Sequence, residues 1–173
     1  WTCISREPHG ITQTHAFQAY EGKLWAGTWP QGYVLRWEDG AWTNTGRLGI
    51  PEGEYKEINE INNMIVYNGK LYAGVIPKAQ VWRYETDGHW TLMNNLASRP
   101  DYAVEEAASW CRVPTMTTFQ GRLFAGTGSC ISRATDVDAD DTLGRVLATE
   151  LGQVVSHDRD IGADWTHVAA IRQ

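Results

Sequence analysis

The sequence has little of what several large classes of protein depend on. It has no run of Lys or Arg, and its formal net charge of -6 at pH 7 gives no basic patch for the phosphate backbone of a nucleic acid. No apolar stretch approaches the roughly 20 residues that span a bilayer. The motifs G-x-S-x-G and H-E-x-x-H and a phosphate-binding glycine loop are missing as well. We therefore expect no nucleic-acid partner and no membrane insertion, and we assign no catalytic residue.

Cysteine is scarce too. The three cysteines, Cys3, Cys111 and Cys130, lack the C-x-x-C spacing of a zinc site and allow one disulfide. Cys111 and Cys130 fall in the same repeat, which makes them the first pair to test. Buried thiols are the alternative, because cysteine is commonly buried without pairing. The chain starts at Trp1, and both a processed mature form and a piece of a longer chain stay open.

Aromatic residues, by contrast, are abundant, with 9 Trp among 173 residues. Several belong to a phrase that occurs three times, as YEGKLWAGTW, YNGKLYAGVI and FQGRLFAGTG. The copies begin at Tyr20, Tyr67 and Phe119 and so repeat at intervals of 47 and 52 residues. Repeats of this length are typical of propellers and other repeat architectures. Helical repeats are excluded because the apolar residues show no 3.6-residue periodicity.

The first two copies lie within units of four short strand-like runs. The runs of the first unit are residues 13–20, 23–28, 33–38 and 41–45. Those of the second unit are residues 60–67, 70–75, 80–85 and 89–93. Tight-turn pairs separate the runs, at Glu21-Gly22, Asp39-Gly40, Asn68-Gly69 and Asp87-Gly88. The dipeptide Trp-Thr marks the fourth run, at Trp42, Trp90 and Trp165, and it also opens the chain.

Four antiparallel strands in such a unit make the blade of a β-propeller. We therefore predict an all-β chain in a single β-propeller-type domain, residues 1–173. Residues 1–5 are the outer strand of a preceding blade, and the blades cover about residues 11–46, 58–94 and 111–169. Propellers typically have four to eight blades, so three leave the ring incomplete. Either further chain or a homo-oligomer completes the ring, or the divergent third unit departs from the propeller plan.

The pattern (Y/F)-x-G-(K/R)-L-(W/Y/F)-A-G, followed by V-x-R-(W/Y)-E and D-G-x-W-T, resembles kelch-like and Asp-box, or sialidase-type, β-propeller repeats. The resemblance covers residues 12–49 and 59–97 well and residues 112–128 in part. Ser156, Asp158, Gly162 and Trp165 resemble the Asp box, a folding turn, with two extra residues before Gly162. The closing DWTHVAAIR is similar to a strand of laminin-G-like lectin domains. This resemblance implies a glycan-active protein outside the cytoplasm, extracellular or periplasmic.

The irregular sequence gathers on one predicted face of the blades. The loops after the second and fourth strands share that face, and they include residues 46–58, 94–110 and 129–142. Aromatic rings beside carboxylates and amides suit a sugar. The candidate ligand-binding residues are Trp29, His15, Tyr55, Glu60, Asn62, Tyr102, Trp110 and Arg112. Packing between blades is the alternative for Trp29 and Trp110. It is our prediction for the aromatics that recur in the units, namely Trp37, Tyr84, Trp42, Trp90 and Trp165.

Alternating aspartates in TDVDADDTLG offer a candidate metal site. Asp136, Asp138 and Asp140 present oxygen ligands of the kind that bind Ca²⁺. They resemble the opening of an EF-hand loop, although Asp141 and Leu147 stand where that loop has Gly and Glu. A hydrated acidic loop is the alternative. We expect no cofactor other than this possible Ca²⁺.

We predict a non-enzymatic binding module whose partner is a glycan or another surface ligand. The first alternative is a partial glycosidase of the sialidase type, which needs two carboxylates about 5 to 9 Å apart. Glu57, Glu60, Glu105 and Glu106 are the candidates for such a pair. The arginine cluster of sialidases is represented in the loops by Arg112 alone. The second alternative is a scaffold whose blades mediate assembly.

Overall fold

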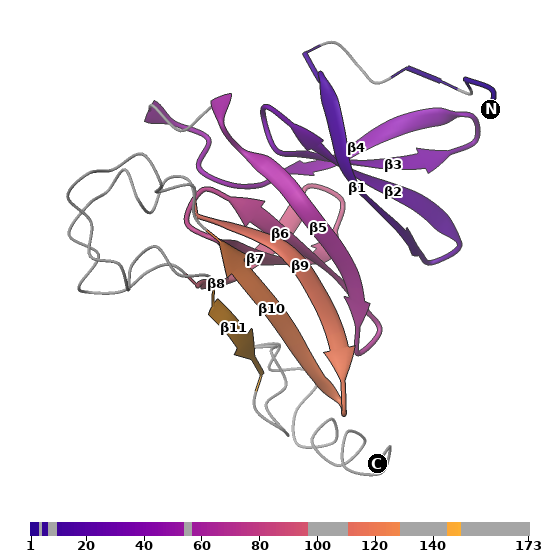
Figure 1. The fold of residues 1–173 in the computed structure, drawn as a ribbon. Coiled ribbons are helices and arrows are strands. Elements are labelled where there is room, and N and C mark those ends of the chain that lie inside the picture. Colours follow the sequence, from indigo (N-terminus) through magenta and orange to yellow (C-terminus); the bar gives the residue numbers. More distant parts are fainter. Residues whose placement is uncertain (4, 7–9, 54–56, 97–110, 129–144, 150–173) are drawn as a thin grey trace.

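The structure is a computed structural model that describes residues 1–3, 5–6, 10–53, 57–96, 111–128 and 145–149. Every regular element in these residues is a β-strand, so the predicted all-β class is confirmed. The strands form three antiparallel sheets, two of four strands and one of three, and none of the sheets is closed (Figure 1). This arrangement fits successive blades, and the ring itself stays a prediction.

The strands follow one another across each sheet in chain order. The first sheet has β1 (Gln13–Tyr20), β2 (Lys23–Trp29), β3 (Tyr33–Glu38) and β4 (Ala41–Arg47). The middle sheet has β5 (Glu60–Tyr67), β6 (Lys70–Ile76), β7 (Gln80–Thr86) and β8 (His89–Asn95). The third sheet has β9 (Arg112–Phe119), β10 (Arg122–Gly128) and β11 (Arg145–Ala148). The eight strands predicted for the first two units are confirmed, each end to within two residues.

The repeated phrase forms the hairpin between the first two strands of each sheet. Both residues of its turn have positive φ, for example Asn68 at 47° and Gly69 at 73°. Gln120 and Gly121 repeat the same geometry at 48° and 73°. A two-residue turn of this kind matches the twist of the flanking strands, and its positive φ angles favour Asn and Gly. The turn therefore explains the first glycine of each copy, which is Gly22, Gly69 or Gly121.

The first joint, between the first and middle sheets, buries a cluster of aromatic side chains. Trp25 is 1% exposed and lies among Tyr20, Tyr84 and Trp90, with ring centroids 4.8 to 6.5 Å from its own. The indole N–H of Trp90 donates across the joint to the carbonyl of Thr45 at 3.1 Å. The predicted packing of Tyr84 and Trp90 between sheets is thus confirmed.

Trp37 and Trp42 hold the corresponding positions in the first sheet, yet both are only half-buried. Their rings contact each other, with centroids 5.1 Å apart. They lie on the face of the first sheet that looks away from the middle sheet. Their predicted packing between blades is therefore not seen among the described residues, and Trp165 lies outside those residues.

The second joint, between the middle and third sheets, is more aliphatic. It buries a cluster that includes Tyr67, Tyr72, Val81, Val113, Met116 and Leu123. The Ala-Gly of the repeated phrase allows the close approach at both joints. A Cβ atom on Gly27 would clash with Ile61, and one on Gly74 would come within 2.7 Å of Val113 Cβ. The geometry of the turn and the close packing at the joint together explain the repeated phrase.

The inner strands of the three sheets lie side by side. β5 lies between β1 and β9 and contacts both (Figure 1). We call the end at which these strands begin the loop end, and the end with the Gly22, Gly69 and Gly121 turns the turn end. Trp1, Thr2 and Cys3 form no strand, so the predicted outer strand has no partner sheet among the described residues. No described segment forms a helix long and apolar enough to cross a membrane.

Candidate functional site

Three of the predicted ligand-binding residues meet at the loop end of β1 and β5. The imidazole Nδ1 of His15 lies 3.2 Å from Glu60 Oε1, across the first joint. The side-chain amide of Asn62 donates to the same oxygen. The other imidazole nitrogen, Nε2, lies 2.8 Å from Gln13 Oε1. We call these four side chains the His15–Glu60 cluster.

A bulge in each inner strand aims two members of this cluster. His15 and Asn62 hold the same position in two copies of the repeat, the third residue of the strand. The pairing with the second strand shifts at this residue, between Thr14 and Ala16 on β1 and at the matching place on β5. A bulge interrupts the alternation of side chains and re-aims the extra residue. One repeated backbone feature thus directs an imidazole and an amide to one carboxylate.

Glu60 is the more shielded of the two ionisable groups in the cluster. Its side chain is 13% exposed, against 29% for His15. A carboxylate so far out of water needs donors, which the imidazole and the Asn62 amide can supply. The Oδ1 atoms of Asn62 and Asn63, however, are buried without a hydrogen-bond partner among the described residues. Such an acceptor costs about 1–3 kcal/mol, so a water molecule or a ligand hydroxyl that donated to it would stabilise the site.

Asn59, directly before β5, fixes the loop beside the cluster. Its side chain is fully buried, its Nδ2 donates to the carbonyl of Ile50, and its Oδ1 accepts from the Ile50 N–H, both at 2.8 Å. Gly49 has a φ of 102°, and a Cβ atom there would clash with the Asn59 side chain. Asn59 also bridges to Gln31, in the turn after β2. Because both polar ends of the buried Asn59 amide are hydrogen-bonded to Ile50, the loop beside the cluster is held in one position.

Trp29 and Arg112 lie at the same end of the sheets. Trp29 is half-buried, closes β2 and stands opposite Gln13 in the strand pairing. Arg112 is half-buried and opens β9, at the strand position that Gln13 and Glu60 hold in the other two sheets. The structure therefore places five predicted ligand-binding residues at the loop end and brings three of them into contact.

Of the other predicted site residues, Glu57 is described and exposed to solvent. The rest lie outside the described residues, namely Tyr55, Tyr102, Trp110, Glu105, Glu106, Asp136, Asp138 and Asp140. Within the described part of the chain, no three His, Cys, Asp or Glu side chains converge to hold a metal ion. The Ca²⁺ site stays a prediction. Cys111 is buried in the second joint, and Cys130, its predicted disulfide partner, is also outside the described residues.

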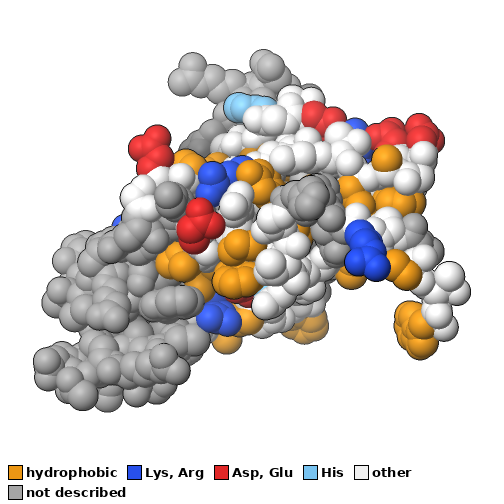
Figure 2. All heavy atoms as spheres, turned by 90° about the horizontal axis from the view of Figure 1, so that it is seen from above, with side chains coloured by type: hydrophobic (Ala, Val, Ile, Leu, Met, Phe, Trp, Pro, Cys, Tyr) orange, Lys and Arg blue, Asp and Glu red, His pale blue; other side chains and the backbone are white. Residues whose placement is uncertain are grey.

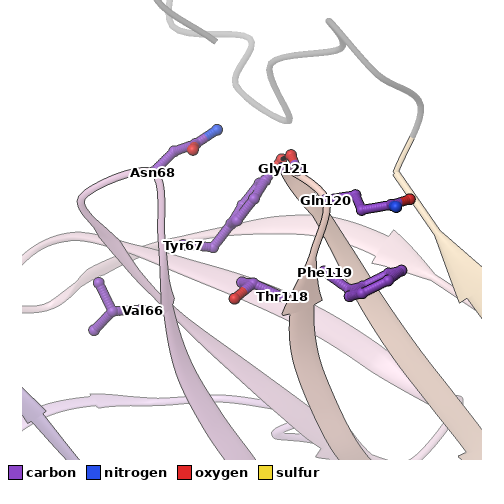
Figure 3. Close-up of a pocket in the computed structure, with 7 residues that line it drawn as sticks. All are labelled: Val66, Tyr67, Asn68, Thr118, Phe119, Gln120 and Gly121. Carbon is purple, nitrogen blue, oxygen red and sulfur yellow. Dashed lines mark hydrogen bonds between the residues drawn. The ribbon is translucent and has the colours of Figure 1, made fainter. Parts of the chain in front are cut away.

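A hollow of about 270 Å³ lies at the turn end, between the hairpins of the middle and third sheets. The phenol of Tyr67 reaches from β5 to the opposite turn, where its hydroxyl donates to the carbonyl of Gly121 at 2.9 Å (Figure 3). Asn68 and Gln120, from the two turns, also line the hollow. Most of its lining belongs to the repeated phrase and the hollow is open, so we interpret it as part of the joint.

Two contributors to the loop end were missed by sequence reasoning. Gln13 contacts the imidazole, and Asn59 holds the adjacent loop. Both stand where the copies of the repeat differ: Thr12 and Cys111 occupy the place of Asn59, and Glu60 and Arg112 occupy the place of Gln13. This difference at the start of each inner strand was the signal that could have found them.

Neither a protein family nor a curated protein matches the sequence. The chemistry of the site therefore rests on the side chains of the His15–Glu60 cluster.

Proposed function

We propose that this chain is a non-enzymatic binding module whose ligand is a carbohydrate or another polyhydroxylated surface ligand, held at the loop end. The observation that carries the proposal is the contact of His15 with Glu60 across the first joint, with Asn62 on the same oxygen. Two strands from different sheets supply these side chains. A rigid pair of sheets thus holds polar groups in a fixed relation, which is what directional recognition of hydroxyl groups requires.

The side chains of the cluster match the chemistry of a sugar. The Glu60 carboxylate accepts hydrogen bonds, the amides of Gln13 and Asn62 both donate and accept, and the imidazole of His15 does either according to its tautomer. Trp29, at the same end, offers a ring on which the apolar face of a sugar can stack. Hydroxyl groups on one side and an apolar face on the other are the recognition features of a pyranose.

The cluster supports binding better than glycoside hydrolysis. Hydrolysis by the usual route needs two carboxyl groups on opposite sides of the scissile bond. Among the described residues, Glu60 is the one carboxylate of the cluster, and its oxygen Oε1 is already engaged by His15 and Asn62. A binding role uses these contacts as they stand.

A glycan array followed by calorimetric titration of the best glycan tests the proposal. We expect Glu60→Gln to weaken binding by roughly tenfold or more, because a hydrogen bond to a charged group contributes about 1.5–3 kcal/mol. Glu21→Gln is the matched control, since it removes the same charge from an exposed residue at the turn end. It should bind like the unaltered chain.

Two results would overturn the proposal. The first is the absence of glycan binding by a folded chain. The second is an affinity that Glu60→Gln leaves unchanged. Release of sugar from a chromogenic glycoside, lost in Glu60→Gln, would instead establish the glycosidase alternative.

A further inference from the structure

The two ends of the row of sheets expose hydrophobic side chains that the joints bury elsewhere. We call the face of each sheet toward the preceding sheet its leading face and the opposite face its trailing face. The leading face of the first sheet carries Phe17, Leu24, Trp37 and Trp42. The trailing face of the third sheet carries Phe119, Phe124 and Val146. The space-filling view likewise shows hydrophobic side chains open to solvent among charged ones (Figure 2).

On the leading face, exposure follows the presence of a neighbouring sheet. Met64 and Leu71 of the middle sheet are 5% and 0% exposed because the first sheet covers them. Phe17 and Leu24 hold the same positions in the first sheet and are 59% and 36% exposed. The leading face of the first sheet thus has the residues of a joint without the covering sheet.

The trailing face of the third sheet shows the same difference. Tyr67 and Val81 of the middle sheet are each 6% exposed beneath the third sheet. Phe119 and Val146 hold the matching positions and are 61% and 78% exposed. Large apolar residues at such exposure on a sheet face mark a contact surface more often than an ordinary surface.

The N-terminal residues already touch the leading face in the manner of a preceding sheet. In the first joint, the Trp90 indole donates to the carbonyl of Thr45, three residues after Trp42 of β4. In the first sheet, the indole of Trp42 donates at 2.7 Å to the hydroxyl of Ser5, four residues after the Trp that opens the chain. Ser5 therefore accepts from Trp42 on the leading face much as Thr45 accepts from Trp90 in the first joint.

We propose that a second copy of this chain covers the leading face, with the trailing face of its third sheet packed on the first sheet of its neighbour. This contact surface is separate from the His15–Glu60 cluster and goes beyond the proposed binding function. The two joints inside the chain argue for this occupant, because they show which side chains such faces accept. The trailing face of the third sheet has the same aromatic positions as the two faces that already fill joints.

The interface joins two different surfaces, so each contact is head to tail. Two copies joined twice in this way would bring six sheets together, which is within the usual size of a propeller.

One hydroxyl distinguishes the proposed contact from the internal joints. Tyr20 donates to the carbonyl of Gly69 at 3.2 Å, and Tyr67 donates to that of Gly121. Phe119 occupies the third place and has no hydroxyl. The contact with Gly22 of the partner copy therefore lacks this bond and is weaker than the internal joints. Phe119→Tyr should restore the bond and tighten association by about two- to tenfold.

Sedimentation velocity of the full chain tests the proposal. We expect association that is lost in Phe17→Glu and in Phe119→Glu, because each places a charge on one of the two faces. Asn94→Glu, at an exposed position on the outer strand of the middle sheet, adds the same charge and should leave association unchanged. Circular dichroism confirms that each variant is folded.

Mixing the two variants separates a head-to-tail contact from a symmetric one. Phe17→Glu keeps an intact trailing face and Phe119→Glu keeps an intact leading face, so an equimolar mixture should form a heterodimer although neither variant self-associates. A stable monomer of the unaltered chain would overturn the proposal. So would a Phe119→Glu variant that still dimerises, because the contact would then be between two leading faces.

Discussion

The two ends of the inner strands differ in how far the copies of the repeat share the same residues. At the turn end the copies agree: Tyr20 and Tyr67 each donate a hydrogen bond to the turn of the next sheet. At the loop end they differ, with Gln13, Glu60 and Arg112 in one and the same strand position. The contacts at the agreeing end hold sheets together, whereas those at the differing end form a polar cluster. Repetition therefore identifies the architecture, and divergence identifies where function is to be sought.

The largest expected effect on stability concerns the second glycine of the repeated phrase, which is Gly74 in the middle sheet. Gly74→Ala would place a Cβ atom 2.7 Å from Val113 Cβ and 2.9 Å from the Val113 carbonyl oxygen. Forcing the two sheets apart should lower the free energy of unfolding by about 1–3 kcal/mol, measured by urea denaturation. Gly126→Ala is the matched control, because its Cβ would meet only the Cγ2 atom of Thr115 closely. Equal destabilisation by the two variants would contradict a role of this glycine in the joint.

The next effect concerns the hydroxyl at the turn end. Tyr67→Phe removes the bond to the Gly121 carbonyl and keeps the ring in the second joint. We expect a loss of about 0.5–1.5 kcal/mol in the free energy of unfolding. Phe119→Tyr, at the equivalent position without a described neighbour, is the comparison and should not destabilise the folded chain. No measurable loss in Tyr67→Phe would remove the hydroxyl from our account of the joint.

A smaller effect with a definite pH dependence comes from the ion pair across the first joint. Arg36 Nη1 lies 2.6 Å from Asp87 Oδ1, and the Tyr84 hydroxyl donates to the same oxygen at 2.7 Å. Desolvation raises the pKa of Asp87, but the bonds from Arg36 and Tyr84 outweigh it and lower the pKa below its ordinary value of 3.8. Burial, with the bond to Asp87, raises the pKa of Tyr84 to about 12, so its hydroxyl stays a donor at neutral pH.

Because the pKa of Asp87 is lower in the folded state, its contribution to stability is present above pH 3.8 and is lost as the pH falls through the folded-state value. Asp87→Asn should therefore lower the free energy of unfolding at pH 7 by about 0.2–1 kcal/mol, as expected for a salt bridge whose carboxylate is partly open to solvent. The difference between variant and unaltered chain should shrink at acid pH. A difference that stayed constant down to pH 2 would show that the charge of Asp87 is not the cause.

The smallest effect on stability should come from the loop end. Asn62→Ala removes one donor to Glu60 together with a buried Oδ1 that has no described partner, so gain and loss partly offset each other. We expect the free energy of unfolding to change by no more than about 0.5 kcal/mol, while glycan binding falls. A larger loss of stability would place Asn62 among the structural residues and blur the distinction between the two ends.

The sequence was sufficient to predict what depends on local chemistry. The turn pairs and the short runs rich in aromatic and β-branched residues located eight strands, because hairpin geometry and strand propensity act within a few residues. The packing of Tyr84 and Trp90 followed from their recurrence. Trp37 and Trp42 recur in the same way but are only half-buried, because no sheet among the described residues covers them. Recurrence predicts a packing position and does not tell whether it is filled.

The candidate site was predicted as residues but not as contacts. His15, Glu60 and Asn62 were named because they fall on the predicted face that carries the long loops. Their meeting on one carboxylate oxygen depends on two bulges and on the packing of one sheet against another. The distances from His15 and from Asn62 to the Glu60 carboxylate do not follow from spacing along the chain. The role of Asn59 depends on a close approach to Ile50, which spacing does not reveal either.

The most direct test of the division between the two ends is a binding titration of the best array glycan to Glu60→Gln and to Tyr67→Phe, at a temperature where both are folded. We predict that Glu60→Gln weakens binding by roughly tenfold or more while Tyr67→Phe binds like the unaltered chain. Equal affinities of Glu60→Gln and the unaltered chain, or a loss in Tyr67→Phe as large as that in Glu60→Gln, would contradict the account.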